Sequence, residues 1–294
     1  MRRPSSHPGT KAPPRRPFAE PGLARITCGG YTLEGTSIST LETCVAVREL
    51  NLCFDIGKGP RYAAGLDNVL LTHAHQDHAV GIALHIATRQ LLDATPPQIY
   101  LPAQIVDDVR NLISAWERLE RRRTRYSLIP VVAGTRYDLR KGLFFKAFPT
   151  EHTIPSIGYQ VFEERRKLKP DYVGLEGPAI VDLKKQGIEV TFPIELPVIT
   201  FVGDSTIAPL DRFPEILTSE ILVLECTFLA PEDRAMAKKK RHTHLLDIVE
   251  RADRLTCDTL VLTHFSTRYT REDVHREVMA VLPESLKGKT RIFL

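Results

Sequence analysis

A short histidine-rich segment, residues 72–78 with the sequence THAHQDH, limits what this chain can fold into more than any other feature. It follows the apolar residues 69–71, so it reads as a strand that runs into a loop, and it carries four potential metal ligands: His73, His75, Asp77 and His78. Residues two apart on an extended strand point to the same side, so the first two histidines can reach one ion. The last two follow where the chain turns and can bind a second ion. Imidazole and carboxylate groups suit zinc and its first-row neighbours, so the segment predicts a dinuclear metal site.

Such a site needs further ligands, and the ends of later strand-like runs supply three. They are His152 after the run 143–148, Asp204 after the run 198–203, and His264 after the run 259–263. A strand end combines a rigid scaffold with a loop on which functional side chains gather. We therefore expect these three side chains to complete the site that residues 73–78 begin.

Strand-like and helix-like runs alternate along the chain. The strand-like runs are 44–55, 68–72, 98–101, 143–148, 157–162, 198–203, 221–226 and 259–263. Helical periodicity is clearest over 103–121, where one apolar stripe contains Ile105, Val109, Leu112, Ile113, Trp116 and Leu119. Further helices are expected over 79–94, 179–186, 207–218, 243–255 and 270–281. This alternation predicts an α/β protein with layered sheets covered by helices, and two sheets between helices are consistent with it.

The first 22 residues differ in composition from the rest. They are rich in Pro, Arg and Ser, and we expect a disordered tail there, followed by one domain over 23–294. The tail lacks an amphipathic apolar face, so a cytoplasmic location is expected rather than organelle targeting. Five scattered cysteines without a CxxC pair also favour reduced thiols with packing roles.

The net charge of +4 lies entirely in residues 1–20, which hold five basic residues and one acidic residue. The remaining chain is balanced, so overall charge does not steer it toward nucleic acid. An RNA backbone would have to be bound by local basic runs, of which there are three: 121–125, 164–167 and 238–241. The alternative is that such a run only forms a solvent-exposed surface. Of the three runs, we favour 238–241 as the RNA-binding one because it leads directly to His242.

Together the candidate ligands resemble the five-motif signature of the metallo-β-lactamase superfamily, with Asp55 in the sequence FDIG as its first motif. The resemblance covers residues 24–294 and implies an αββα sandwich of two mixed sheets between helices. Within the superfamily the chain most resembles ribonuclease Z, the tRNA 3′-processing endonuclease. The supporting stretches are HTIPSIGY at 152–159, ECTF at 225–228, the pair His242-Thr243 opening a helix, and LTHFSTRY at 262–269.

The resemblance implies a role for each candidate ligand. One zinc is expected on His73, His75 and His152, a second zinc on Asp77, His78 and His264, with Asp204 bridging both and Asp55 orienting a histidine ring. Manganese or iron are alternatives to zinc. Outer partners such as Asp55 fix the ring orientation of a ligand.

The expected chemistry is hydrolysis of a phosphodiester. Two metal ions about 3.5–4 Å apart can share a hydroxide and brace a phosphoryl oxygen, and Asp77 can hold or accept the proton of the attacking water. His242, paired with Glu225, is the candidate donor to the departing ribose oxygen, as the equivalent pair is in the family. His244 is the competing histidine, and ordinary strand-end and helix-start roles are the alternative for the pair. Residues 266–268 can add hydrogen-bond donors to a phosphate, and a purely structural turn is the alternative for them.

Two departures from the ribonuclease Z pattern concern the substrate. Residues 29–38 stand where the family has a Gly-rich loop with an Arg-Asn pair, and 160–198 reads as a reduced form of the arm that grips the tRNA elbow. We expect a zinc-dependent endonuclease that removes 3′ trailers from tRNA precursors. Hydrolysis of another phosphodiester, such as other RNA or a cyclic nucleotide, or of a thioester or lactam, is the alternative. The complete ligand set disfavours a silent binding module, and family members are commonly homodimers.

Overall fold

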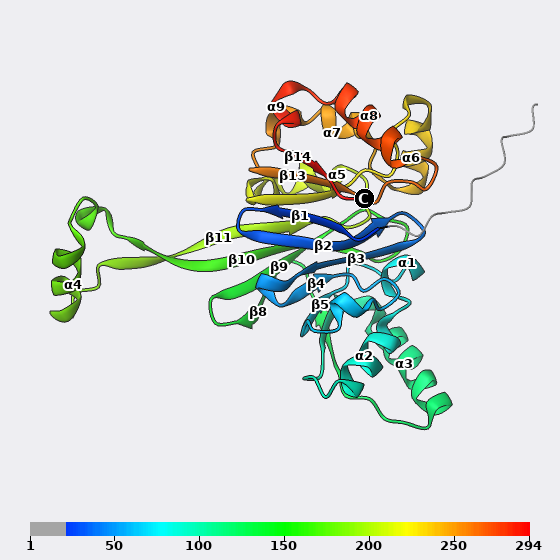
Figure 1. The fold of residues 1–294 in the computed structure, drawn as a ribbon, viewed down its shortest axis with the longest axis horizontal. Coiled ribbons are helices and arrows are strands. Elements are labelled where there is room, and N and C mark those ends of the chain that lie inside the picture. Colours follow the sequence, from blue (N-terminus) through cyan, green and yellow to red (C-terminus); the bar gives the residue numbers. More distant parts are fainter. Residues whose placement is uncertain (1–21) are drawn as a thin grey trace, which may run out of the picture.

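The continuous apolar runs of the sequence form strands that are buried on both faces. In β12 (Ile221–Glu225), Ile221 and Val223 belong to one hydrophobic cluster, whereas Leu222 and Leu224 belong to another. Successive side chains on a strand point to opposite faces, so such a run needs a packed layer on each side. The computed structural model, which describes residues 22–294, has these layers: two sheets face to face, with helices outside (Figure 1). The predicted fold class is confirmed, whereas the predicted tail lies outside the described residues except for residue 22.

Both sheets have seven strands. The first runs in the order β1 (Ala24–Cys28), β2 (Tyr31–Ile38), β3 (Glu42–Val47), β4 (Leu52–Phe54), β5 (Asn68–Leu70), β6 (Gln98–Pro102) and β7 (Ser127–Val131). The second runs β14 (Thr290–Ile292), β13 (Thr259–Thr263), β12, β11 (Thr191–Phe201), β10 (Ile157–Leu168), β9 (Leu143–Pro149) and β8 (Arg136–Arg140). Neighbours are parallel from β4 to β7 and from β11 to β14, and antiparallel elsewhere. The loops that follow neighbouring parallel strands therefore meet at one edge of each sheet.

Helices cover the outer face of each sheet. Those on the first sheet are α1 (Gln76–Ala79), α2 (Ile82–Leu91) and α3 (Val106–Glu120). Those on the second are α5 (Ala208–Arg212), α6 (Arg234–Lys240), α7 (Leu245–Val249), α8 (Arg271–Val281) and α9 (Glu284–Lys287). Within residues 22–294, no helix has the length and apolar character needed to cross a membrane.

The main strands and helices lie where the sequence predicted them, with two kinds of difference. The run 44–55 is two strands, β3 and β4, separated by a turn at 48–51 in which Asn51 adopts a left-handed φ of 51°. Asparagine adopts this conformation more readily than most residues, so Asn51 suits the position where the chain turns from β3 to β4. The strands that the sequence did not predict are β1, β2, β7, β8 and β14. Most of β1, β7 and β8 is only partly buried, so their apolar signal is weak.

The apolar stripe predicted for α3 splits in two. Val109 and Ile113 pack against the sheet, as expected, and are 5% and 1% exposed. In contrast, Leu112, Trp116 and Leu119 are 48%, 49% and 73% exposed, so only part of the predicted apolar stripe faces the core. The stripe of 103–121 is wider than the surface that the first sheet offers to one helix.

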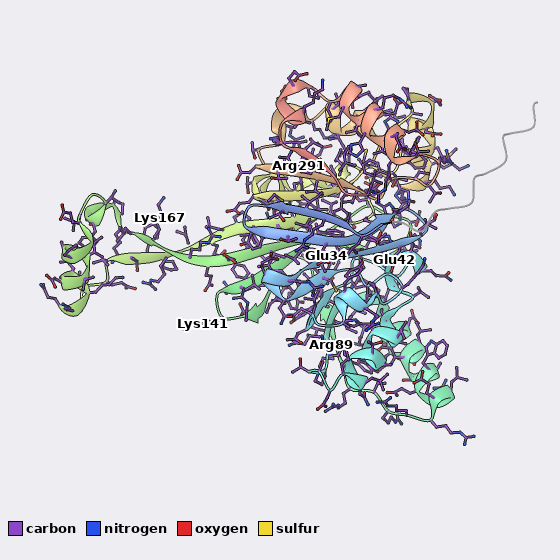
Figure 2. The ribbon with its side chains drawn as sticks, viewed as in Figure 1. Glu34, Glu42, Arg89, Lys141, Lys167 and Arg291 are labelled. Atoms are coloured by element: carbon purple, nitrogen blue, oxygen red, sulfur yellow. The ribbon has the colours of Figure 1, made fainter. Side chains whose placement is uncertain are left out.

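Strands β10 and β11 extend beyond the body of the molecule as a two-stranded ribbon with α4 (Gly177–Lys185) at its tip (Figure 1). The pairing continues to Leu168 opposite Thr191, and no residue of α4 is buried. Figure 2 shows Lys167 on this ribbon, far from Arg89, which belongs to α2 in the body of the molecule. We call residues 160–198 the arm. The ends of the arm, with Val161 and Val198, belong to the core, whereas its outer part lies away from the body.

Candidate metal centre

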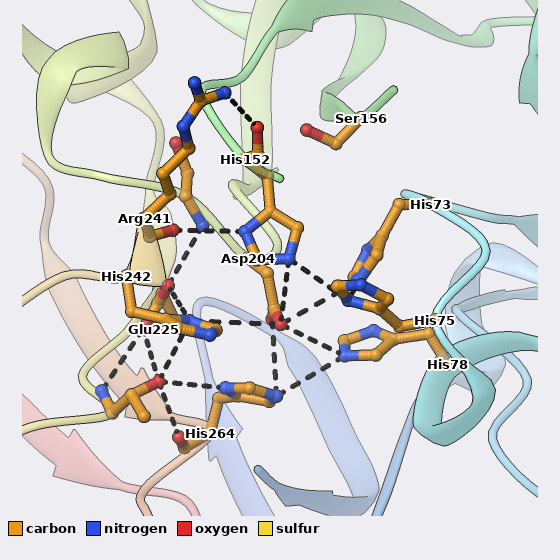
Figure 3. Close-up of polar contacts among 12 residues, drawn as sticks. His73, His75, His78, His152, Ser156, Asp204, Glu225, Arg241, His242 and His264 are labelled. Atoms are coloured by element: carbon orange, nitrogen blue, oxygen red, sulfur yellow. Dashed lines mark hydrogen bonds and ion pairs between the residues drawn. The ribbon is translucent and has the colours of Figure 1, made fainter. Parts of the chain in front are cut away.

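The seven side chains that the sequence singled out as metal ligands lie together where the parallel strands of both sheets end (Figure 3). Two histidines follow β5, one aspartate and one histidine lie in α1, and the others follow β9, β11 and β13. Most of these side chains are buried, and two are half-buried. Residues that are up to 191 positions apart in the sequence, His73 and His264, thus reach one site.

The first group of ligand atoms consists of His73, His75, His152 and Asp204, whose ligand atoms all lie within 4.8 Å of one another. Nδ1 of His75 is 3.1 Å from Nε2 of His73 and 3.1 Å from Nε2 of His152. A carboxylate oxygen of Asp204 lies 3.8 Å from His73 and 3.9 Å from His152. Three nitrogens and one oxygen at these separations can surround one cation.

The second group consists of Asp77, His78 and His264. The Nε2 atoms of the two histidines are 3.4 Å apart, and an Asp77 oxygen is 3.8 Å and 3.7 Å from them. Asp204 also approaches this group, with one oxygen 3.5 Å from His78 and the other 3.3 Å from His264. Asp204 therefore lies between the two groups and can contact ions in both.

The outer hydrogen bonds of the histidines show that these atoms suit a metal. Nδ1 of His152 lies 3.1 Å from the carbonyl oxygen of Arg241, which can only accept, so the ring donates from Nδ1 (Figure 3). Nδ1 of His78 donates in the same way to Asp55 at 2.7 Å. Since a neutral imidazole has one N–H, Nε2 of each ring keeps a free lone pair toward the centre. Nε2 of His152 belongs to the first group and Nε2 of His78 to the second, so each group has a nitrogen lone pair that can bind a cation.

Asp55 holds the inner end of this arrangement. It is completely buried, with a left-handed φ of 55°, and accepts hydrogen bonds from the backbone and hydroxyl of Thr72 at 2.7 and 2.9 Å. Burial raises the pKa of Asp55, although His78 and Thr72 oppose this rise. The hydroxyl of Thr72 donates to Asp55 and accepts from Nδ1 of His73 at 2.9 Å. Asp55 thus orients one ring directly and another through a threonine.

The charges at the centre call for a cation. Burial opposes ionisation of Asp204, but His264 and His78 outweigh it and hold its pKa well below the usual value. Burial lowers the pKa of His73 well below its usual value, so this ring is neutral. Burial also disfavours charge on His78, yet Asp204 and Asp55 raise its pKa well above the ordinary value. The two carboxylates therefore favour positive charge beside His78, which a bound cation would supply while His78 stays neutral.

Asp77 reaches the centre from the first turn of α1. The backbone N–H of Thr40, in the loop between β2 and β3, donates to it at 2.8 Å. Burial opposes its ionisation, but the neighbouring rings of His264 and His78 lower its pKa to about 2. Asp77 is therefore an ionised carboxylate at neutral pH, better suited to bind a cation or orient water than to take a proton.

Glu225 and His242 form a pair beside the two groups. Nδ1 of His242 donates to Glu225 at 2.8 Å and is 4.0 Å from Asp204 (Figure 3). Burial disfavours charge on His242, but Glu225 outweighs it and raises the pKa to about 9. The ring also stacks on that of His264, with centroids 5.6 Å apart. At neutral pH His242 is thus a protonated donor at the wall of the site.

The competing histidine has a structural place. His244 is buried, donates from Nε2 to the carbonyl of Ala230 at 2.8 Å, and accepts from the N–H of Leu246 at 3.1 Å. These contacts cap α7, so this helix begins at Leu245. The prediction that His242 and Thr243 open the helix is wrong by about one turn, because the cap is His244.

The centre opens into a cavity of about 1050 Å³. Among the residues outside the metal groups that line it are Ile38, Phe228, Met236 and Lys240. Residues 266–268, expected as phosphate donors, also line it. The guanidinium of Arg268 is held by Asp233 at 3.2 Å and lies 5.6 Å from the ring centroid of Phe228. Cationic side chains attract phosphate groups and aromatic rings stack on nucleobases, so this wall suits a nucleotide substrate.

The basic runs have different surroundings. In the run 238–241, Lys240 lines the cavity, but Arg241 donates to the carbonyl of His152 at 2.6 Å. In the other runs, Arg165 pairs with Glu163 at 3.0 Å, and Arg123 pairs with Glu117 at 3.0 Å. Much of this charge is therefore compensated by neighbouring carboxylates, and Lys240 is the residue of these three runs that lines the cavity.

Sequence reasoning missed the residues that orient the predicted ligands. Thr72 and Thr227 contact histidine rings through their hydroxyl groups, and Arg241 contacts His152 through its backbone and side chain. Their positions in the sequence could have indicated the two threonines. Thr72 directly precedes the candidate ligand His73, and Thr227 follows Glu225 by two residues at a strand end.

The sandwich and its histidine and aspartate cluster define a metal-dependent hydrolase, and comparison with known proteins identifies the class. Residues 51–265 match the model of the β-lactamase superfamily domain. The chain is 37% identical over 262 residues to the chloroplastic tRNase Z TRZ2 of Arabidopsis thaliana, covering 88% of this chain and 74% of that protein. It is 36% identical over 265 residues to tRNase Z TRZ1 of the same plant, covering 88% and 94%. The chain therefore belongs to the ribonuclease Z family of the β-lactamase superfamily.

Solved structures agree with this fold. The short form of human tRNase Z matches with a TM-score of 0.57 at 20% identity, covering 80% of this chain and 92% of that chain. The metallo-β-lactamase fold protein YhfI of Bacillus subtilis matches with a TM-score of 0.59 at 16% identity, covering 87% and 92%. At these identities the likeness shows the fold, and the αββα sandwich expected from the sequence is confirmed.

Proposed function

We propose that this chain is an endonuclease that removes 3′ trailers from tRNA precursors by hydrolysing one phosphodiester bond. The observation that carries the proposal is the Glu225–His242 pair, a proton donor with a pKa of about 9 beside the metal-binding groups. Hydrolysis of a phosphodiester expels a ribose oxygen, which needs such a donor, whereas a thiolate leaves without one. The Arabidopsis relatives, both named tRNase Z, support tRNA as the substrate.

We propose two metal ions in the cluster, and the donor set of imidazole and carboxylate favours zinc over manganese or iron. The proposed ligands are His73, His75 and His152 for one ion, Asp77, His78 and His264 for the other, and Asp204 for both. Ions bound there would supply an activated water and stabilise charge on a phosphoryl oxygen. Elemental analysis of the purified protein tests this assignment, and a single ion or none per chain would contradict it.

The side chains have separate roles in the proposed reaction. Asp77 stays ionised and accepts a hydrogen bond from the attacking water, which fixes the direction of attack. The sequence left open whether Asp77 holds the attacking water or also accepts its proton. We propose that it only holds the water, because its pKa is too low for it to accept the proton. His242 gives its proton to the departing ribose oxygen, and Glu225 stabilises the charged ring before that step. The wall residues Phe228 and Arg268 receive the nucleotides next to the cleaved bond.

A comparison of three substrates tests the proposed function. Metal-loaded protein is incubated with a tRNA precursor that carries a 3′ trailer, with a chromogenic phosphodiester, and with a thioester. We expect cleavage of the precursor and of the small diester. Hydrolysis of the diester alone would refute the tRNA substrate, and turnover of the thioester alone would refute phosphodiester chemistry.

We propose that the arm contacts the folded body of the tRNA at a distance from the cleaved bond. Its tip exposes apolar side chains, with Val173, Leu175 and Val181 being 69%, 42% and 48% exposed. Among residues 22–294, Lys167 and Lys169 on the arm make no ion pair. Unpaired lysines bind a phosphate backbone, and exposed apolar residues mark a contact surface.

Shortening the arm should weaken precursor binding and leave the chemistry intact. The hairpin can be closed early by replacing residues 170–189 with Asn-Gly, because Lys169 and Val190 are already joined by a backbone hydrogen bond of 2.9 Å. We expect KM for the precursor to rise by about tenfold, which is roughly 1.4 kcal/mol of binding. Hydrolysis of the small diester should not change. An unchanged KM for the precursor would show that the arm is not part of the substrate site.

We further propose that two copies of this chain associate through the helices of the first sheet. The exposed apolar residues there are Leu84, Leu91, Leu92, Leu112, Trp116 and Leu119. Monomeric proteins seldom leave so many large apolar side chains exposed on neighbouring helices. An isologous pair buries the same patch on both chains.

Introducing a charge into this patch should separate the two copies. Trp116→Glu places a carboxylate where each copy would contact its partner, so sedimentation velocity should show a shift from dimer to monomer. The matched control is Val173→Glu, an exposed apolar residue at the arm tip, which should leave the dimer intact. A wild-type chain that sediments as a monomer at micromolar concentration would contradict the proposal.

We propose a cytoplasmic location. The support is that Cys44, Cys53, Cys226 and Cys257 are buried free thiols and Cys28 is a half-buried one, as is usual in reducing compartments. A fluorescent fusion of the full chain should give diffuse cytoplasmic signal in plant cells. Signal confined to plastids, the compartment in the name of one Arabidopsis relative, would contradict it.

A further inference from the structure

The hydroxyl group of Thr227 lies between the metal-binding groups and the proton donor. Its Oγ1 atom is 2.6 Å from a carboxylate oxygen of Glu225 and 3.0 Å from Nδ1 of His264. The residue is 3% exposed and follows β12 by two positions. One buried hydroxyl thus touches the partner of His242 and a proposed metal ligand at the same time.

The directions of these two hydrogen bonds follow from the chemistry of the partners. An ionised carboxylate can only accept, so the single hydrogen of Thr227 points to Glu225. The carbonyl of His264 lies at 3.1 Å, but the carboxylate at 2.6 Å is the closer acceptor. The hydroxyl oxygen must then accept from Nδ1–H of His264. This leaves a lone pair on Nε2 of His264, the atom that faces Asp204 at 3.3 Å.

The same arrangement occurs on the other sheet, which is independent support. The hydroxyl of Thr72 donates to Asp55 at 2.9 Å and accepts from Nδ1 of His73 at 2.9 Å. In both places the carboxylate also accepts from Nδ1 of a second histidine, His78 at 2.7 Å for Asp55. The chain therefore uses a carboxylate, a threonine and a histidine twice to fix a ring whose Nε2 faces the centre.

We infer that Thr227 is a positioning residue that couples the metal site to the proton donor. Through one hydroxyl it fixes the tautomer of His264, and it holds Glu225 in the place from which that carboxylate binds His242 at 2.8 Å. The inference rests on the proposed function where His242 is the proton donor of the reaction. The role of Thr227 in orienting the metal ligand His264 does not depend on the substrate. Outer partners of metal ligands affect both metal affinity and rate.

The test removes the hydroxyl while keeping the shape of the side chain. Thr227→Val leaves Nδ1–H of His264 and one oxygen of Glu225 without this partner, whereas Thr227→Ser keeps the hydroxyl. The matched control is Thr290→Val, because Thr290 is 2% exposed and its hydroxyl donates to the carbonyl of Leu286 at 2.8 Å, away from the site. If Thr227→Val is insoluble, Thr227→Ala compared with Thr227→Ser isolates the hydroxyl.

Two readouts separate positioning from packing. Metal retention is measured by competition with a chelator, without substrate, and kcat and KM are measured on the precursor and on the small diester. We expect Thr227→Val to lose metal affinity and kcat by about 10–100-fold each, with KM unchanged. Thr227→Ser should restore most of both, and Thr290→Val should behave like wild type.

Two outcomes would overturn the inference: wild-type metal retention and kcat in Thr227→Val, or a Thr227→Ser protein as defective as the valine variant. Failure of the proposed function looks different. A wild-type protein that hydrolyses the small diester but not the precursor refutes tRNA as substrate, and the Thr227 comparison is still decided by metal retention and the diester.

Discussion

Asp204→Asn should abolish catalysis while leaving the fold intact. The carboxylate of Asp204 lies between the two groups of ligand atoms, 3.8 Å from His73 in the first and 3.3 Å from His264 in the second. An amide has nearly the same shape but carries no charge, so the cations lose the group that both can contact. Because metal ions supply several kcal/mol of transition-state stabilisation, we expect kcat to fall by more than about 10³-fold.

Elemental analysis should show that Asp204→Asn binds fewer metal ions than wild type. The matched control is Asp138→Asn, an exposed carboxylate on β8 that pairs with Arg136 at 2.8 Å, which should keep both activity and metal. Circular dichroism checks that both variants are folded. If Asp204→Asn keeps its full metal content and rate, Asp204 is not a shared ligand.

His242→Ala should slow cleavage of the precursor by about 10²–10⁴-fold, the usual contribution of a positioned proton donor. The loss should be much smaller for a nitrophenyl phosphodiester, because nitrophenolate leaves without a proton. This difference distinguishes a proton donor from a residue that only shapes the site. An equal loss on both substrates would contradict the assigned role.

The pH dependence of kcat gives a second readout for His242. Burial disfavours the charged ring, but Glu225 raises the pKa of His242 to about 9, so the ring is protonated and active below that pH. The rate should therefore fall as the pH rises through about 9. In Glu225→Gln the carboxylate is gone, so the fall should move to lower pH. A decline at unchanged pH in that variant would show that another group titrates.

Three candidate ligands, His152, Asp204 and His264, could be predicted because each follows a strand with a run of buried apolar residues. Leu260, Val261 and Leu262 give β13 a continuous apolar run, which locates the strand and therefore its carboxyl end at His264. Asp204 was found in the same way after β11. The remaining four ligands, His73, His75, Asp77 and His78, were found from their spacing. Side chains two residues apart on an extended chain point to the same side, so the two first histidines can reach one ion.

The network that orients these ligands could not be predicted from the sequence. It depends on which ring nitrogen meets which acceptor, for example Nδ1 of His152 against the carbonyl of Arg241. Backbone carbonyls belong to every residue, so they leave no trace in the pattern of side chains. Arg241 illustrates the difficulty: it belongs to a basic run that suggested RNA binding, yet it contacts His152 from two sides.

Sequence periodicity also could not predict which apolar residues of α3 are exposed. Periodicity identifies an apolar stripe on a helix but not the surface that covers it, and here the sheet covers Ile113 but leaves Trp116 49% exposed. The arm shows the same limit. Its pairing residues were predicted to be strands only up to 162, because the ribbon beyond that point is charged and has no core beneath it.

Mapping the ends of the cleaved RNA decides whether this chain removes 3′ trailers from tRNA precursors. Protein stripped of metal by a chelator and then reloaded with zinc is incubated with a tRNA precursor, and both products are sequenced at their new ends. The proposed function predicts a single cut after the discriminator nucleotide, a 3′-hydroxyl on the tRNA and a 5′-phosphate on the trailer, with cleavage lost on stripping and restored on reloading. Cleavage that persists in the stripped protein, or cuts scattered along the precursor, would contradict it.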